Sequence, residues 1–383
     1  MTPISPKGYT LHVHARDIRY HDAVGNFAKQ VVKLASTAGW RTRLWAENFD
    51  GTGEEVEQRD RFWQAVHEND VIFFNFSIFD PALESVLKLN AKKILYYHNI
   101  TPPNLLNDER EVVSARLGQA QIPLACGFDA IIANSRFSKH ALIAHSPSAQ
   151  QLALEDMVLI CPPIVGIDRW HEIAAEPIDG AYASTMFLYV GRLTHHKGVL
   201  ELLEAFEMLA TRIGELGLTI VGSPRQEGYL DAIRQRASEI SRSRGCPIQI
   251  HCNVSDGQLK TLYQRATAFI TFTRHEGFCI PIVDAFFFGK PVFVVPAPAV
   301  VELVANAGFV LPDFDSTTAG RAILKVLGQA GWANLHADFR TQRLKSIRAN
   351  ADGTMILDLL RTFAEVGVQA QATSCISNAR HHL

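Results

Sequence analysis

The chain has 383 residues, of which 47% are hydrophobic and 20% are charged. This length and composition are typical of a globular protein with two or three domains. Its 37 basic and 39 acidic residues nearly cancel, so the charge gives no reason to expect a nucleic-acid partner. The six cysteines form no C-x-x-C pair, which favours free thiols in a reducing compartment over a disulfide framework or a zinc site.

Residues 1–7 lack the apolar segment of a signal peptide. The longest apolar stretch, from Phe286 to Val310, is interrupted by Gly289-Lys290-Pro291 and by Glu302. It therefore does not predict a membrane span. We expect a cytoplasmic protein. A peripheral membrane contact stays open, because such a contact leaves little trace in a sequence.

Short apolar runs alternate with longer amphipathic stretches along the whole chain. The runs have the length and the β-branched or aromatic content of buried parallel strands. In the first half the predicted strands are Leu11–Ile18, Arg41–Ala46, Val71–Ile78, Lys93–His98, Ala130–Asn134 and Val158–Ile164. In the second half they are Met186–Val190, Leu218–Gly222, Ile248–Cys252, Ala268–Thr273, Pro291–Val295 and Phe309–Leu311.

Helical patterns lie between these runs. One apolar face extends from Ala28 to Ala38 and stops at Gly39, and another extends from Val199 to Leu209 with helical spacing. Such alternation predicts the α/β class, with parallel sheets joined by right-handed crossovers. Residues 162–184 are rich in Pro and Gly and show no sustained period, so they are the predicted linker. We therefore expect two Rossmann-like domains, over residues 1–168 and 184–352.

The strongest local motif runs from Val190 to Gly198. It follows a predicted strand and opens a predicted helix, the place where open α/β sheets bind ligands. Gly191 permits a tight turn, while Arg192 and Lys197 add two cations beside helix N-terminal amides that already favour anions. The simpler interpretation is a basic surface turn. The position of the motif at the end of a strand nevertheless favours a phosphate site over such a surface turn.

A second motif runs from His275 to Ala285 and includes Glu276, Gly277 and Asp284. It also follows a strand, and Pro281 suits the first turn of a helix. We expect Glu276 in the loop and Asp284 in the first turn of that helix. Two carboxylates suit a polyol because they accept hydrogen bonds from its hydroxyl groups. The alternative for Asp284 alone is stabilisation of the helix dipole.

Together these motifs resemble glycosyltransferase family 4. The second domain of that family carries a Gly-Arg…Lys-Gly element and a Glu-Gly-Phe-Gly-x-Pro…Glu element. This chain has Gly191-Arg192 with Lys197-Gly198, and Glu276-Gly277-Phe278 with Pro281. Similar but less specific elements of the first half are His98-Asn99-Ile100-Thr101-Pro102-Pro103, Ala133-Asn134-Ser135 and Asp22-Ala23-Val24-Gly25-Asn26. The resemblance implies the GT-B fold, in which two Rossmann-like domains face each other across a cleft and a C-terminal helix, here 353–370, packs back on the first.

The resemblance also implies the role of each matching residue. Arg192 and Lys197, after Gly191, would hold the donor's diphosphate. Glu276 and the backbone of Gly277 and Phe278 would contact the donor sugar. Asp284 would bind the ribose, His98 would face the sugar from the other domain, and Gly25 would let its loop approach the phosphates.

Two positions depart from the family pattern: Asp284 replaces a glutamate, and Cys279 replaces the second glycine. In the first half, the alternative for His98 is a core histidine, although its place before a Pro-rich loop favours the site. For Ser135 we expect a structural role as the N-cap of the helix from Phe137 to Ile143.

The resemblance implies a retaining transfer of a hexosyl group from a nucleoside diphosphate sugar to a hydroxyl of a sugar or glycoconjugate. We expect no metal and no cofactor, because Arg192 and Lys197 supply the positive charge that a metal would provide. Asp313-Phe314-Asp315 matches a metal-binding D-x-D pattern, but the following polar residues favour a turn and a helix cap. The alternatives are a glycosidase, a nucleotide-sugar epimerase, and a catalytically silent nucleotide-sugar-binding subunit.

Overall fold

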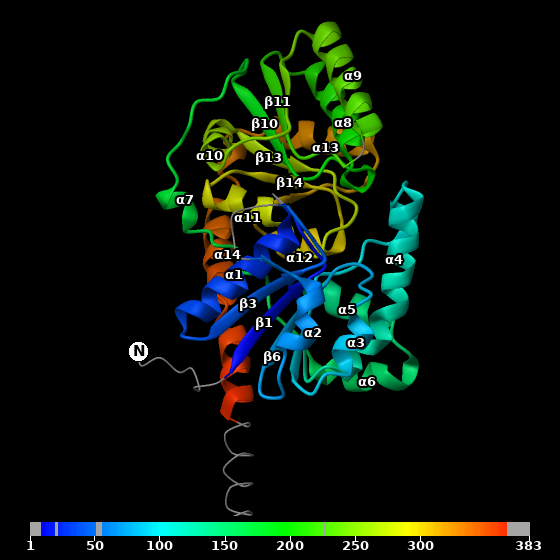
Figure 1. Cartoon of the computed structure of the whole chain (residues 1–383). Coiled ribbons are helices and arrows are strands. Elements are labelled where there is room, and N and C mark those ends of the chain that lie inside the picture. The colour runs from blue at the N-terminus through cyan, green and yellow to red at the C-terminus, as the bar shows by residue number, and fades with distance from the viewer. Residues whose placement is uncertain (1–8, 20–21, 51–55, 226, 366–383) are drawn as a thin grey trace, which may run out of the picture. The chain divides into compact units, whose positions relative to one another are not determined.

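The computed structural model describes residues 9–19, 22–50, 56–225 and 227–365 (Figure 1). Within these ranges the chain divides into two compact units. Unit 1 holds the described residues of 1–100 and 114–164, together with those from 350 onwards, and unit 2 holds those of 101–113 and 165–349. The change from unit 1 to unit 2 at residue 164 falls within the Pro- and Gly-rich segment, and residues 165–168 group with unit 2.

Unit 1 is built on a seven-stranded sheet in which neighbouring strands are parallel. In spatial order its strands are β5 (Val56–Gln58), β3 (Arg41–Ala46), β1 (Thr10–Ala15), β6 (Val71–Phe76), β7 (Lys92–Tyr97), β8 (Ala130–Ala133) and β9 (Val158–Ile160). In the register, His14 of β1 lies between Trp45 of β3 and Phe74 of β6. Two short strands, β2 (Asp17–Ile18) and β4 (Asn48–Phe49), pair separately.

One face of this sheet is covered by α1 (Ala23–Thr37) and by a helix over residues 354–365. Phe27 and Val31 of α1, Val13 of β1, and Ile356 and Leu360 of the last helix share one apolar cluster. The burial of such side chains stabilises the unit by about 1.5–3 kcal/mol each. The other helices between β5 and β9 are α2 (Phe62–Ala65), α3 (Leu83–Leu87), α4 (Glu109–Gln121), α5 (Arg136–Ala144) and α6 (Ser148–Met157).

Unit 2 has a six-stranded sheet, again with parallel neighbours. Its spatial order is β12 (Ile248–His251), β11 (Leu216–Val221), β10 (Thr185–Val190), β13 (Ala268–Thr271), β14 (Val292–Val294) and β15 (Phe309–Val310). Its helices are α7 (Arg169–Glu172), α8 (Val199–Ala210), α9 (Glu227–Arg244), α10 (Asp256–Arg265), α11 (Ile280–Phe287), α12 (Pro298–Val304), α13 (Ser316–Leu327) and α14 (Ala337–Asn350).

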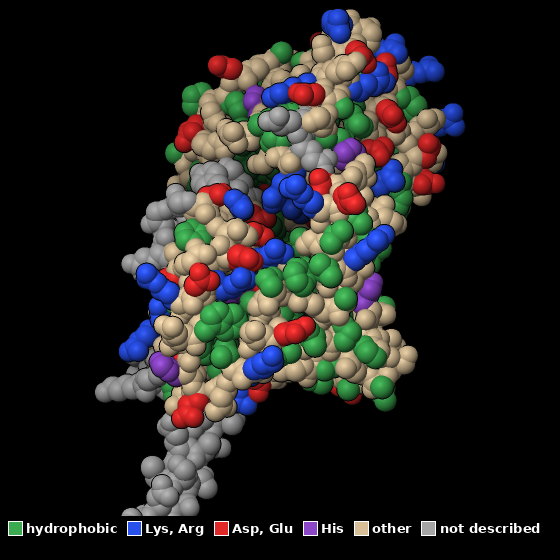
Figure 2. All heavy atoms as spheres, turned by 45° about the vertical axis from the view of Figure 1, so that its right-hand side comes forward, with side chains coloured by type: hydrophobic (Ala, Val, Ile, Leu, Met, Phe, Trp, Pro, Cys, Tyr) green, Lys and Arg blue, Asp and Glu red, His purple; other side chains and the backbone are tan. Residues whose placement is uncertain are grey.

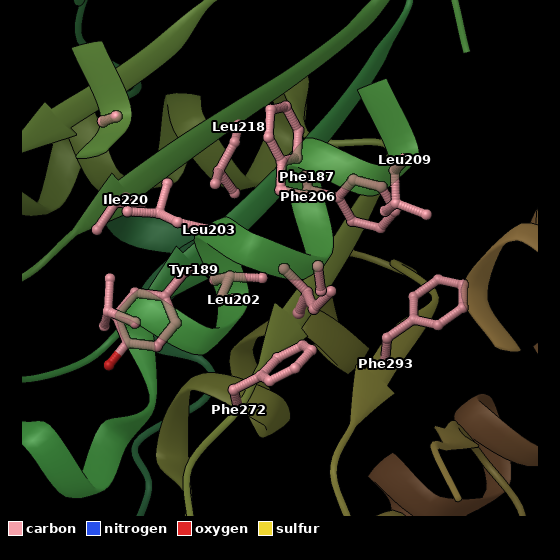
Figure 3. Packing of buried hydrophobic residues seen from close by; sticks show 14 of the residues in the cluster. Phe187, Tyr189, Leu202, Leu203, Phe206, Leu209, Leu218, Ile220, Phe272 and Phe293 are labelled. Carbon is pink, nitrogen blue, oxygen red and sulfur yellow. The ribbon is translucent and has the colours of Figure 1, made fainter. Parts of the chain in front are cut away.

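Helix α8 is fixed firmly onto this sheet (Figure 3). Its apolar face, with Leu202, Leu203 and Phe206, packs against β10 and β11, which contribute Phe187 and Leu218. These residues are among the almost fully buried side chains of unit 2. The N-terminus of α8, where the first predicted motif ends, therefore has a rigid support.

The strand–helix alternation and the parallel sheets predicted from the sequence are confirmed. Each predicted run contains a strand, but the first is longer than β1 and continues into the separate β2. The last predicted strand of the first half stops at Ile160, because Pro162 and Pro163 follow. The short edge strands β4 and β5 were not predicted. Residues 366–370 of the predicted C-terminal helix lie outside the described residues, and the facing of two domains across a cleft stays a prediction.

The surface of the described residues carries charges of both signs. Figure 2 shows acidic and basic side chains interspersed over the visible face, with apolar side chains among them. Of the helices that the structure describes, none has both the length and the apolar character needed to cross a bilayer.

Candidate active site

The strand order of unit 2 reverses at β10. Strand β11 lies on one side of β10, and β13 lies on the other. In parallel sheets the loops that leave two such strands diverge and open a crevice at their carboxyl ends, where ligands bind. The loop after β10 contains the first predicted motif, and the loop after β13 contains the second. The fold therefore brings both motifs to the same edge of one sheet.

The turn between β10 and α8 depends on glycine. Gly198 precedes α8 with a left-handed backbone, φ 66°, which side chains other than glycine adopt at a cost. A Cβ on Gly198 would lie 2.3 Å from the carbonyl oxygen of Phe272, the residue that directly follows β13. This close backbone contact joins the two motif loops.

Lys197 and Glu276 meet across these loops. The ammonium of Lys197 donates a hydrogen bond to Oε1 of Glu276 at 2.7 Å and lies 3.3 Å from the carbonyl oxygen of His275. Lys197 is 5% exposed, whereas Glu276 is partly exposed. Two residues predicted for the site are thus in direct contact, and each largely neutralises the charge of the other.

Arg192 has the opposite character. Its side chain is exposed, and among the described residues it has no hydrogen-bond or ion-pair partner. Its backbone is fixed, because the Tyr189 hydroxyl donates to the Arg192 carbonyl oxygen at 3.1 Å. A Cβ on Gly191 would lie 2.8 Å from that hydroxyl, so glycine allows this turn. Arg192 is therefore the site cation that is open to an anion.

Two buried histidines flank Lys197. Burial, reinforced by the nearby charges of Lys197 and Arg192, lowers the pKa of His196 to about 2. Burial and Lys197 likewise lower the pKa of His275 to about 3. Both rings are therefore neutral near pH 7 and add no positive charge to that of Arg192 and Lys197.

The second motif continues from its loop into α11. Gly277 and Phe278 are partly exposed beside Glu276, whereas Cys279 is buried. Helix α11 begins at Ile280, with Pro281 in the predicted first turn. The prediction that Asp284 lies in that first turn is wrong, because the first turn contains no acidic residue.

Asp284 instead lies one turn further along, at 4% exposure. Its carboxylate accepts a hydrogen bond from Trp170 Nε1 at 2.7 Å and contacts Arg169 Nη2 at 3.3 Å through each oxygen. Desolvation raises the pKa of Asp284, and the charge of Arg169 opposes that rise. A ribose contact of Asp284 stays a prediction, and the structure directs this carboxylate to Arg169 and Trp170. Neither partner was predicted from the sequence.

In unit 1, His98 directly follows β7 and is half-buried. Its Nε2 lies 2.9 Å from Oδ1 of Asn75, whose Nδ2 donates to the carbonyl oxygen of His14 at 3.0 Å. Because that carbonyl can only accept, the Asn75 oxygen faces His98, so His98 Nε2 carries the proton. Burial lowers the pKa of His98 to about 3. The ring is thus neutral, and its Nδ1 is an acceptor suited to a hydroxyl group.

The backbone next to His98 is strained. Asn99 has φ 75°, a left-handed conformation that is uncommon outside glycine and often found at functional sites. It is stabilised because the Asn99 side chain accepts from the Ile100 amide at 2.8 Å and donates to Ser138 at 3.2 Å. Ser135 accepts from the Ser138 amide and caps α5, which confirms its predicted structural role.

Gly25 lies within α1, where its amide donates to the N-cap residue Asp22 at 3.0 Å. A Cβ at this position would come 3.1 Å from Cα of Ile18. The structure thus gives Gly25 a packing reason, and its contact with a donor phosphate stays a prediction.

The D-x-D sequence is placed at a helix start. Asp315 is the N-cap of α13 and accepts from the Thr318 amide at 2.7 Å, as the turn chemistry predicted. No group of three or more His, Cys, Asp or Glu side chains suited to a metal occurs among the described residues. The metal-free expectation itself stays a prediction.

Known proteins resemble this chain in sequence over the part that carries both motifs. Residues 178–343 match the family model of group 1 glycosyl transferases. A Xanthomonas campestris GDP-mannose:cellobiosyl-diphosphopolyprenol alpha-mannosyltransferase is 32% identical over 121 residues, covering 32% of this chain and 31% of that protein. A Salmonella typhimurium lipopolysaccharide 1,2-N-acetylglucosaminetransferase is 28% identical over 224 residues, covering 57% and 52%. The chain thus spans about a third to a half of the length of the curated relatives it matches.

Solved structures show the same fold. The Anabaena protein HepE in complex with UDP-glucose has a TM-score of 0.69 at 15% identity, covering 95% of this chain and 99% of that one. A trehalose-phosphate synthase from Burkholderia vietnamiensis has a TM-score of 0.68 at 11% identity, covering 94% and 98%. Residues 178–343 therefore resemble group 1 glycosyl transferases in sequence, and the fold of two Rossmann-like units is confirmed.

Proposed function

We propose that this protein transfers a hexosyl group from a nucleoside diphosphate sugar to a hydroxyl of a sugar or glycoconjugate acceptor, with retention at the anomeric carbon. One observation carries the proposal. At the carboxyl edge of the unit 2 sheet, the Lys197–Glu276 pair lies in the same pair of loops as Arg192, within the segment that matches the glycosyl transferase family. Cations suit the diphosphate, and a carboxylate suits the hydroxyls of the sugar.

In the proposed reaction, the bond between the anomeric carbon and the diphosphate oxygen breaks, and a bond from that carbon to the acceptor oxygen forms on the same face. The acceptor's proton passes to the departing phosphate. Arg192 and Lys197 stabilise the negative charge that develops there. Because these two side chains supply the cationic charge, we propose that no divalent metal takes part.

The relatives suggest where to look for substrates. One is named for GDP-mannose and a diphosphopolyprenol-linked acceptor, and another for N-acetylglucosamine and lipopolysaccharide. We propose a role in polysaccharide or glycoconjugate synthesis. We also propose a cytoplasmic location, which is supported by the five described cysteines all being free thiols.

The test combines binding with turnover. GDP-mannose, UDP-N-acetylglucosamine and UDP-glucose should be screened for a rise in melting temperature, since a ligand that binds only the folded protein stabilises it. The stabilising donor is then incubated with sugar and lipid-linked acceptors in excess chelator, and released nucleotide and product anomer are measured. We expect an acceptor-dependent release of nucleotide and a retained anomer.

Other outcomes would support the alternatives. Conversion of the donor without an acceptor would identify an epimerase, and binding without turnover would identify a silent subunit. Release of free sugar from plain oligosaccharides would identify a glycosidase. Loss of activity in chelator that magnesium or manganese restores would contradict the metal-free mechanism.

A further inference from the structure

The second carboxylate of the site motif is already occupied by the protein itself. Trp170 Nε1 donates to Oδ1 of Asp284 at 2.7 Å, and Arg169 Nη2 lies 3.3 Å from both oxygens. A carboxylate can accept about four hydrogen bonds, and the contacts from Trp170 and Arg169 already use three of these positions on Asp284. With 4% exposure, the group has little surface left for a ligand.

The groups that hold Asp284 are themselves fixed. Trp170 is 1% exposed and packs edge-on against Tyr263 and Phe288, with ring centroids 6.0 Å and 5.3 Å away. Its carbonyl oxygen accepts a hydrogen bond from Lys260 of α10 at 2.6 Å. The indole cannot turn away from Asp284 without repacking this cluster.

Arg169 links Asp284 to Val165, the first residue of the longer of the two segments that form unit 2. Its Nη1 donates to the carbonyl oxygen of Val165 at 2.7 Å, and its guanidinium lies 4.5 Å from the centre of the Trp170 ring. The chain passes from unit 1 to unit 2 between residues 164 and 165. The Arg169 side chain therefore connects the first residues of unit 2 after this point to α11.

Helix α11 directly follows the loop that carries Glu276. Its first residue, Ile280, is four residues after Glu276 and four before Asp284. Because a helix is stiff over such a length, fixing Asp284 also fixes the point where the Glu276 loop ends. That loop is in turn bound to Lys197.

We propose that Arg169 and Trp170 are positioning residues. They hold Asp284 within the protein, so that this carboxylate fixes α11 and the Glu276 loop and does not bind the donor's ribose. The inference rests on the proposed function, because the loop that it positions is the proposed sugar-binding loop. It also gives a structural meaning to the aspartate that replaces the glutamate of the family pattern.

The first experiment measures ribose recognition. Dissociation constants are determined for UDP and GDP and for their 2′-deoxy and 3′-deoxy counterparts, in the wild type and in Asp284→Ala and Asp284→Asn. We expect the ratio between deoxy and ribose forms to stay within about twofold of the wild-type ratio in both variants, since the ribose contacts lie elsewhere. A ratio that falls to about one only in the variants would show that Asp284 binds the ribose, and would overturn the inference.

The second experiment separates positioning from binding. Trp170→Phe removes the indole donor but keeps Asp284 and an aromatic ring. We expect it to lower kcat for transfer by about tenfold while the donor's KM changes less than threefold. The displaced Glu276 loop would lose contacts to the sugar that are stronger in the transition state than in the ground state. A Trp170→Phe variant with wild-type kcat would overturn the inference.

A matched control is available in unit 1. Trp45 is also fully buried, and its Nε1 donates to His12 Nδ1 at 3.1 Å. Trp45→Phe therefore loses an indole donor of the same kind, and we expect its kcat to stay within about twofold of wild type. If it lost as much activity as Trp170→Phe, the effect would be one of general stability. If no nucleotide bound the wild type, the proposed function itself would fail, whereas an altered ribose ratio leaves that function intact.

Discussion

The first six strands of the unit 1 sheet have the same order as the six strands of the unit 2 sheet, but the charged residues at the two reversals of strand order are paired differently. In unit 1 the order reverses at β1, with β3 on one side and β6 on the other, as it does at β10 in unit 2. The charges that follow the strands of unit 1 pair among themselves. Arg16 lies 3.2 Å and Arg59 3.0 Å from Glu47, and Arg59 is also 3.7 Å from the buried Asp80. In unit 2, one cation of the corresponding edge, Arg192, is exposed and has no such partner among the described residues.

This difference teaches that topology alone does not make an anion site. Parallel sheets bring loops together at a reversal of strand order, but the charge balance of those loops decides what can bind. A cation with a carboxylate partner, which includes Lys197 of unit 2, must share or loosen that contact when it binds a phosphate, whereas the exposed Arg192 loses less. We therefore expect the donor's diphosphate at the edge of unit 2.

The largest effect should come from removing the cations of unit 2. We expect Lys197→Ala and Arg192→Ala each to lower turnover roughly thirty- to a thousand-fold, because a charge-assisted bond to the leaving group is worth about 2–4 kcal/mol. The measurement is kcat for transfer with the donor found by the binding screen.

Arg16→Ala is the control from unit 1. It removes a cation from the equivalent edge, where the charge is already compensated by Glu47. We expect it to keep turnover within a few-fold of wild type. Equal losses in Arg16→Ala and Arg192→Ala would show that the two edges do not differ as proposed.

The sequence predicted the features that depend on local pattern. Apolar runs fix the strands, and the motif at Val190–Gly198 could be placed at a strand end because strand and helix patterns flank it. It could not predict that Lys197 pairs with Glu276, since this contact depends on how two loops approach each other. The partners of Asp284 are more than a hundred residues away in sequence, and only a tryptophan beside an arginine in a polar linker hinted at them. The partner of His98 left a clearer signal, since Asn75 is a polar residue within an apolar strand.

A substitution of His98 tests whether unit 1 contributes an uncharged hydrogen bond to the sugar, in contrast to the cations of unit 2. The resemblance predicts that this residue contacts the transferred sugar. We expect His98→Ala to lower kcat/KM for transfer tenfold or more, because positioned hydrogen-bonding groups commonly supply about 10²–10⁴. The affinity for free nucleoside diphosphate should not change, since that ligand lacks the sugar. Asn75→Leu should show a smaller loss of the same kind, because it leaves the ring in place but removes the contact that orients Nε2. If His98→Ala transferred at the wild-type rate, unit 1 would supply no such group.

The last comparison concerns stability and involves two glycines, Gly198 before α8 and Gly25 near the start of α1. Each glycine lies at or near the start of the helix that follows the strand at which the strand order reverses, β10 for Gly198 and β1 for Gly25. Only Gly198 has a left-handed backbone. Gly198→Ala should lower the free energy of unfolding by roughly 1–2 kcal/mol from that conformation alone. The loss of unfolding free energy should be larger still because the new Cβ would lie 2.3 Å from the Phe272 carbonyl oxygen.

Gly25→Ala should lower the free energy of unfolding less, since its Cβ would lie 3.1 Å from Ile18 and a small shift would relieve the contact. Urea unfolding of each variant measures the difference. A Gly25→Ala loss equal to that of Gly198→Ala would mean that the loop at Gly25 is as tightly constrained as the one at the anion site.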